Sequence, residues 1–169
     1  MAEIHKFSLS YDTVEDRIAW DAEAQDGSTT RMWLTQRLCQ AVVKAMVPMI
    51  VQASPQEVPR GGETAVQSWE QAAAMADFGK VAPVKPQPQS LAGLVRTVNL
   101  RPAGEKVVLT FDFGAPAPCA IGINLPQIRQ TLSVIHGLYV AAGWPLDFWP
   151  AWIADPTAAV GAARTDMVN

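Results

Sequence analysis

The sequence is poor in the residues from which catalytic and metal sites are usually built. It contains two histidines and two cysteines among 169 residues, and Cys39 and Cys119 are too far apart for a Cys-x-x-Cys motif. It has no His-Glu-x-x-His metal motif, no Gly-x-Ser-x-Gly nucleophile motif and no glycine-rich phosphate loop. These absences favour a protein that is not an enzyme and predict no metal and no cofactor. The two cysteines are either free thiols or a disulfide.

The chain also lacks a surplus of basic residues and a long apolar run. It has 13 Lys and Arg against 16 Asp and Glu, a net charge of −3, which does not favour binding through phosphates. The apolar run at residues 42–51 is interrupted by Lys44 and Pro48 and is too short to span a bilayer. The N-terminus lacks the basic and apolar regions of a signal peptide. We therefore expect a cytoplasmic protein without membrane contacts.

Few side chains are available for acid–base chemistry. A nucleophilic or acid–base site would have to use His5 or His136, and we interpret both as surface or core-edge residues. The acidic residues Asp12, Glu15 and Asp16 form either a solvated turn or a weak cation site. An enzyme of unknown class stays open as an alternative.

The most informative stretch is residues 31–38, where the spacing of apolar residues changes. Before it, residues 3–11, 17–25 and 28–33 alternate apolar and polar side chains, which predicts three strands. Asp26-Gly27 predicts a tight turn between the last two. After it, helical spacing predicts a helix over residues 35–52 with Thr35 as N-cap and a kink or end near Pro48. The helical face consists of Leu34, Leu38, Val42, Met46 and Ile50.

The same pattern recurs 91 positions later, where Leu34 and Gln36 correspond to Leu125 and Gln127. This half predicts strands around residues 94–100, 106–113 and 120–125, then a helix from 126 to about 142 that Gly143 ends. We interpret the chain as two copies of one β-β-β-α unit, packed as a pseudo-two-fold pair in a single α+β domain. Residues 1–52 form the first unit, 53–90 a connecting helix and proline-rich linker, 91–143 the second unit, and 144–169 a tryptophan-rich closing segment and tail.

The connecting segment has three parts. Residues 53–62 are turn formers, and residues 63–79 predict a weaker helix. Residues 81–90 alternate proline with polar residues, which indicates an extended, semi-rigid linker. This helix has a thin apolar stripe, which consists of Val66, Trp69, Ala73 and Ala76. It either belongs to the core, swaps between chains or lies on the surface.

Residues 144–153 contain three of the six tryptophans. So much apolar area is not expected to face water. The segment either packs across the helices or the sheet edge and closes the core, or it docks a protein partner or a second copy of the chain. The candidate binding residues are Trp144, Phe148, Trp149 and Trp152.

Two resemblances accompany these patterns. Residues 9–12, 15–18 and 33–38, together with 143–146 and 149–152, resemble an uncharacterised family of small bacterial proteins, which implies no activity. In topology, tandem units of sheet and helix are similar to the single-stranded-DNA-binding regulator fold of the PC4 and Whirly proteins. Those proteins use four strands per unit and a basic sheet face, whereas this chain predicts three strands and is acidic.

The leading hypothesis is a non-enzymatic cytoplasmic binding or accessory protein that acts through protein–protein contacts or self-association. The alternative is a single-stranded nucleic-acid-binding protein, for which a basic sheet face would be needed. Phe111 and Phe113 alternate with polar residues and are expected to face the core instead of nucleic acid. The basic residues that would share the sheet face are Arg96, Arg101, Lys106 and Arg129.

Overall fold

The computed structural model describes residues 4–53, 62–76, 78–79 and 82–155. Its helices and strands confirm the predicted α+β fold class. Most of the predicted turn segment 53–62 and of the predicted tail lies outside the described residues. The elements are, in chain order, β1 (Ile4–Asp12), β2 (Arg17–Ala24), β3 (Thr29–Leu34), α1 (Gln36–Ala53), α2 (Glu63–Ala76), β4 (Leu91–Leu94), β5 (Thr97–Ala103), β6 (Lys106–Asp112), β7 (Cys119–Asn124), α3 (Leu125–Ala142) and α4 (Ala151–Ala154).

The strands form two sheets, with orders β1-β2-β3-β4 and β5-β6-β7. Neighbouring strands are antiparallel except β3 and β4, which run parallel. The predicted turn between β2 and β3 is present, because Gly27 has a φ of 80° and its amide donates to the carbonyl of Ala24 at 2.9 Å. A positive φ suits glycine, which lacks a Cβ. This local signal therefore sets the second hairpin.

The chain passes from one sheet to the other at Val95 and Arg96. The amide of Val95 donates to the carbonyl of Trp33 in the first sheet at 2.9 Å, and the amide of Arg96 donates to the carbonyl of Asp112 in the second at 2.7 Å. The single strand predicted around residues 94–100 is therefore two strands, β4 and β5, which pair in different sheets. Gly93 permits the close approach of Phe113 beside this bend, because a Cβ there would lie 2.8 Å from the Phe113 ring.

Trp20 lies where the two sheets meet. It is fully buried, and its ring centroid lies 5.3 Å from that of Phe7 in the first sheet and 5.0 Å from that of Phe111 in the second. Phe111 and Phe113 both face the core, as predicted. Buried side chains from both sheets and from α1 and α3 form one continuous cluster. The two halves of the chain therefore share a single hydrophobic core.

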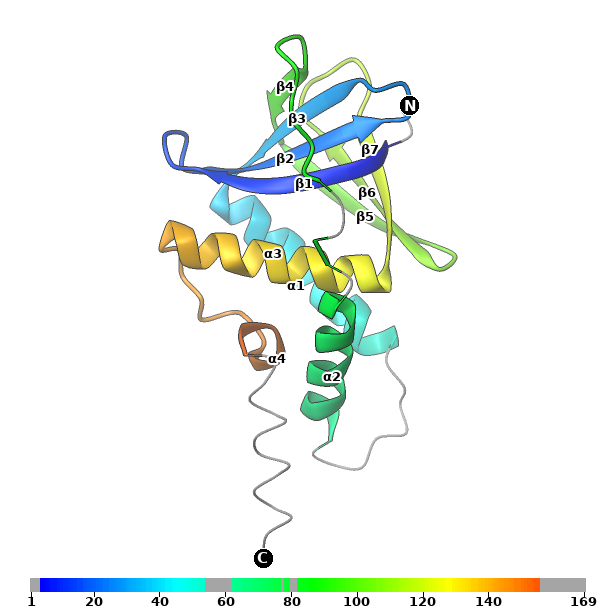
Figure 1. Cartoon of the computed structure of the whole chain (residues 1–169), viewed down its shortest axis with the longest axis vertical. Coiled ribbons are helices and arrows are strands. Elements are labelled where there is room, and N and C mark those ends of the chain that lie inside the picture. Colours follow the sequence, from blue (N-terminus) through cyan, green and yellow to red (C-terminus); the bar gives the residue numbers. More distant parts are fainter. Residues whose placement is uncertain (1–3, 54–61, 77, 80–81, 156–169) are drawn as a thin grey trace, which may run out of the picture.

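Helices α1 and α3 join the two halves. Helix α1 contacts β2 of its own half and β5 of the other, while α3 contacts β7 of its own half and β1 of the other. Figure 1 shows both helices directly beneath the strands, with α2 and α4 farther from the sheets. Because each half packs its helix partly on the other half's strands, the halves form one structural unit.

The helix ends follow the sequence signals. Thr35 caps α1, since its hydroxyl accepts a hydrogen bond from an amide of the first turn at 3.3 Å. Asn124 begins α3 with a full capping box, and Gly143 ends it in the left-handed conformation with a φ of 67°. Helix α1 continues through Pro48 to Ala53, although proline supplies no amide hydrogen to the helix.

The two halves repeat the order of elements but differ in strand pairing. Leu9 lies opposite Trp20 in the first half. The 91-residue shift would place Leu100 opposite Phe111, whereas Leu100 lies opposite Leu109. A displacement of two residues keeps the same side chains facing inward, because strands alternate with a period of two. The duplication and its pseudo-two-fold symmetry stay predictions.

The position of Phe111 predicts a large effect of its removal on stability. Phe111→Ala deletes a fully buried ring that joins the sheets, so we expect the free energy of unfolding to fall by about 3–5 kcal/mol. Urea denaturation followed by circular dichroism measures this change. Phe78→Ala is the control, because Phe78 is 49 % exposed. Equal losses in the two variants would contradict the role of Phe111 as the link between sheets.

Candidate functional site

The tryptophan-rich segment predicted as a binding surface folds back onto α3. Trp144 and Trp149 are 8 % exposed, Trp152 is 7 % exposed, and Phe148 is half-buried. The ring of Tyr139 on α3 lies 4.9 Å from Trp144, 5.7 Å from Phe148 and 5.5 Å from Trp149. This burial favours the interpretation that the segment closes the core, and partner binding by these four residues stays a prediction.

The acidic turn between β1 and β2 anchors this segment. The carboxylate of Asp16 accepts hydrogen bonds from the Tyr11 hydroxyl at 2.7 Å and from the Trp144 indole at 3.1 Å. The carboxylate of Asp12 accepts from the amides of Glu15 and its preceding neighbour, which lowers the pKa of this carboxyl. Asp12 and Asp16 therefore act as structural acceptors in the turn.

The two histidines lie in different surroundings. His5 Nε2 lies 3.6 Å from Glu23 Oε1, in a partly exposed pair across β1 and β2. His136 on α3 packs edge-on against Trp149, with ring centroids 5.0 Å apart. Burial lowers the pKa of His136, because desolvation disfavours the charged imidazole. The structure thus places one histidine at the surface and one at the edge of the core, as predicted.

The cysteines do not provide a reactive site. Both are free. Burial raises the pKa of Cys39 to about 12 and that of Cys119 to about 11, so both are protonated at neutral pH. Within the described part of the chain, no group of three or more His, Cys, Asp and Glu residues is arranged to hold a metal ion. None of the described helices has the length and apolar character needed to cross a membrane.

Helix α2 packs with its polar face inward. Gln67, Ser68 and Gln71 are buried, with Gln71 fully so, whereas Trp69 is 69 % exposed. The thin apolar stripe seen in the sequence therefore does not face the core. Three of the four stripe residues are exposed, namely Trp69, Ala73 and Ala76. The fourth, Val66, is half-buried.

Arg129 on α3 is the reason for this orientation. Its guanidinium donates to the carbonyl and the side-chain oxygen of Gln67 at 3.3 and 2.7 Å and to the carboxylate of Glu70. The side-chain amide of Gln71 donates to the Arg129 carbonyl at 2.9 Å. Arg129 is 5 % exposed and its guanidinium carbon lies 5.4 Å from the Trp152 ring centroid. A buried cation requires polar partners, and the inward face of α2 supplies them.

The four basic residues predicted to share a sheet face do not all lie on one face. Arg129 is buried between α2 and α3, while Arg101 and Lys106 are exposed on the β5–β6 hairpin and Arg96 lies in the bend before β5. The ring of Phe111, the one aromatic residue of β5, β6 and β7, faces the core. Single-stranded nucleic-acid binding stays a prediction, and the outward face of this sheet has no aromatic platform on which bases would stack.

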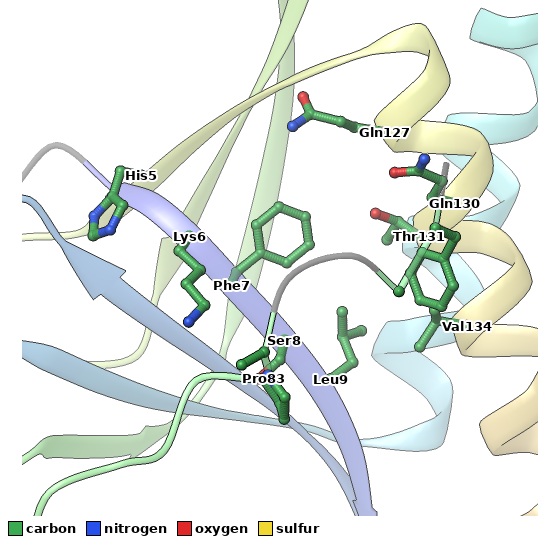
Figure 2. Close-up of a pocket in the computed structure, with 13 residues that line it drawn as sticks. His5, Lys6, Phe7, Ser8, Leu9, Pro83, Gln127, Gln130, Thr131 and Val134 are labelled. Carbon is green, nitrogen blue, oxygen red and sulfur yellow. The ribbon is translucent and has the colours of Figure 1, made fainter. Parts of the chain in front are cut away.

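A cavity of about 500 Å³ lies between β1 and α3. Figure 2 shows Phe7 and Leu9 of β1 pointing towards α3, from which Gln127, Gln130 and Val134 approach. Residues 78–79 and 82–83 form a third side. Sequence reasoning missed this cavity, because its walls come from opposite ends of the chain and no local motif connects them.

Comparison with protein-family models, curated proteins and solved structures finds no match for this chain. The resemblance to the family of small bacterial proteins, and the looser one to the PC4 and Whirly fold, therefore stay predictions. The function has to be argued from the surfaces that the fold creates.

Trp152, which is buried, and Trp69, which is exposed, provide a matched pair of variants that tests the orientation of α2. We expect Trp152→Ala to lower the free energy of unfolding by about 3–5 kcal/mol, because it removes a buried ring that packs on Arg129. We expect Trp69→Ala to change it by less than about 0.5 kcal/mol, because most of that ring is exposed. Urea denaturation of both variants measures the difference. A loss at Trp69 as large as that at Trp152 would contradict the orientation of α2.

The lowered pKa of His136 predicts a pH-dependent stability. The pKa of His136 in the folded chain lies below its value of about 6.5 in the unfolded chain. As the pH falls through about 6.5, the unfolded chain therefore takes up the proton more readily than the folded chain, which stabilises the unfolded state. We expect stability to decrease between about pH 7 and about pH 5, and to decrease less in His136→Gln. Urea denaturation at both pH values tests this. Parallel decreases in wild type and variant would refute the assignment to His136.

Proposed function

We propose that this protein is a non-enzymatic binding or accessory protein that acts through protein–protein contacts, with the outward face of α2 as its contact surface. The observation that carries the proposal is the reversed polarity of this helix. Its inward face is built from Gln67, Ser68 and Gln71, while Trp69 is 69 % exposed on the opposite face. A surface helix of a monomer ordinarily has the opposite arrangement.

Burial of the polar face has a cost in free energy. The Oγ of Ser68 and the Oε1 of Gln71 are buried and have no hydrogen-bond partner among the described residues. Such groups cost about 1–3 kcal/mol each in lost hydration. The isolated chain therefore has buried polar atoms without partners on one face of α2 and the exposed indole of Trp69 on the other. Contact of the outward face with a partner would bury the apolar area that the chain alone leaves in water.

The chemistry of this face fits an apolar stripe of a partner's helix. The outward side of α2 carries small side chains around Trp69, because its other exposed positions include Ala65, Ala72, Ala73 and Ala76. Small residues let a second helix approach closely, and amphipathic helices commonly dock in such apolar grooves. A hollow of about 370 Å³ lies beside Trp69, and its lining includes the ends of α1 and α3: Ile50, Ala53, Leu125 and Pro126.

Trp69 is the residue on which binding should depend. Tryptophan is enriched among the few interface residues whose removal costs 2 kcal/mol or more. We expect Trp69→Lys to weaken binding of an amphipathic helical peptide, selected from a displayed library against the wild-type protein, by at least about 30-fold. Val140→Lys is the matched control, because it adds the same charge at an exposed apolar position on α3. Isothermal titration of the three proteins measures the affinities.

Two outcomes would contradict the proposal. One is a selection that yields no helical binder, and the other is a binder whose affinity is equal for Trp69→Lys and wild type. Light scattering coupled to size exclusion identifies a different occupant. A wild-type dimer that Trp69→Lys converts to a folded monomer would show that this face binds a second copy of the chain and not a helix of another protein.

A further inference from the structure

The cavity between β1 and α3 runs along one edge of the first sheet. Within the described residues, β1 ends the strand order of that sheet and pairs with β2. One wall of the cavity consists of the consecutive residues 5–9 of β1. Successive side chains of a strand point to opposite faces, so a wall of consecutive residues includes the backbone edge of the strand. The opposite wall is one face of α3, at helical spacing: Gln127, Gln130, Thr131 and Val134.

The hydrogen bonds of the first sheet show which backbone groups of β2 face β1. The amide of Ala24, the last residue of β2, donates to the carbonyl of Ser28 at 2.9 Å, on the side of β3. In an antiparallel sheet, successive residues of a middle strand bond alternately to its two neighbours. Asp21 is three residues before Ala24, so its backbone faces β1, where Ser8 lies opposite it. Ser8 therefore exchanges its backbone hydrogen bonds with β2.

The residues on either side of Ser8 face the other way. By the same alternation, Phe7 and Leu9 direct their N–H and C=O groups towards the open edge. Among the described residues, no backbone hydrogen bond joins β1 to the linker before β4. The linker is held instead by the Ser8 side chain, whose hydroxyl accepts from the Val84 amide at 3.1 Å. An edge that presents N–H and C=O groups is a template on which another strand can pair.

The side chains that face each other across the cavity beside this edge are apolar. Figure 2 shows Phe7 and Leu9 directed towards α3, with Val134 on the helix opposite Leu9. Lys6 lies opposite Glu23 on the other face of β1, and Figure 2 shows its side chain directed away from α3. No Asp or Glu is among the described residues that line the cavity. A charged side chain placed here would lose hydration without gaining a partner, so a matching strand has apolar side chains where it faces α3.

We propose that the open edge of β1 binds an extended segment of a partner protein. The segment adds a strand to the first sheet beside Phe7 and Leu9 and directs alternate apolar side chains towards α3. In this kind of recognition, main-chain hydrogen bonds supply affinity and the alternate side chains supply specificity. A strand of usual length, about 5–6 residues, matches the wall formed by residues 5–9.

This site is distinct from the helix-binding surface proposed above. Trp69, on which binding at α2 depends, does not line this cavity. The partner segment is extended here and helical there. The inference therefore does not rest on the proposed contact at α2, and neither result decides the other.

Amide hydrogen exchange of the wild-type protein, followed by NMR, is the first test. We expect β2 to protect the amides of Ser8 and Ser10, and those of Phe7 and Leu9 to exchange at least about tenfold faster. The probes are acetylated and amidated peptides Lys-Thr-Z-Thr-Z-Thr-Lys, in which Z is Val, Ile, Leu or Phe. We expect at least one to bind with a Kd below about 1 mM. It should slow exchange at Phe7 and Leu9 and leave Ser8 and Ser10 unchanged.

Two matched comparisons separate strand addition from other contacts. The tightest peptide is N-methylated either at its two Z residues or at its first two Thr residues. Only one of these sets of amides can face β1, so we expect the affinities of the two methylated peptides to differ by at least about tenfold. We expect Val134→Lys to weaken peptide binding by at least about tenfold, because it places a charge in the apolar part of the cavity. Val140→Lys is the control, since Val140 is exposed on α3 and does not line the cavity.

Four results would each overturn the proposal. They are protection of Phe7 and Leu9 in the peptide-free monomer, no binding by any probe, equal affinities of the two methylated peptides, and equal weakening by Val134→Lys and Val140→Lys. A dimer in light scattering, with Phe7 and Leu9 protected in the dimer, would assign the edge to a second copy of the chain instead. Because hydrogen exchange uses the wild type, it does not depend on whether a variant folds.

Discussion

The contact between Trp20 and Phe111 is the interaction on which the rest of the structure depends. It joins the first sheet to the second through two fully buried rings whose centroids lie 5.0 Å apart. Aromatic rings bury more apolar area than other side chains, so this pair brings the four-stranded and the three-stranded sheet into one core. The bend at Val95 and Arg96 carries the chain from the first sheet to the second, which pack on one core.

A second constraint is the buried cation of Arg129. Its guanidinium bonds to Gln67 and Glu70, and this requirement decides which face of α2 points inward. Hydrophobic patterning alone would turn Trp69 towards the core. The charge prevails because an unpaired buried guanidinium costs more free energy than an exposed indole. The surface that we propose for protein contacts is thus a consequence of how the protein satisfies one buried charge.

The two tryptophan-bearing regions differ in how far their indoles are buried. The closing segment packs its indoles around Tyr139, and Asp16 from the distant β1–β2 turn accepts a hydrogen bond from Trp144. The buried indoles of that segment belong to the core. An exposed indole lies instead at Trp69 on α2, and a cavity lies at the β1–α3 contact. Two surfaces with different chemistry therefore stand apart on one compact core.

The sequence by itself determined the local structure. Alternation with a period of two predicted the strands, Thr35 and Gly143 marked helix ends, and Asp26-Gly27 marked a turn, because these signals depend on backbone and side-chain geometry within a few residues. Only the tertiary structure decided that the strand around residues 94–100 divides between two sheets, that α2 turns its polar face inward, and that a cavity opens between β1 and α3. Those features depend on partners far away in the chain, such as Trp33, Asp112 and Arg129. Periodicity shows which face of an element is apolar, but it does not show which charged side chain or backbone group of another element lies opposite that face.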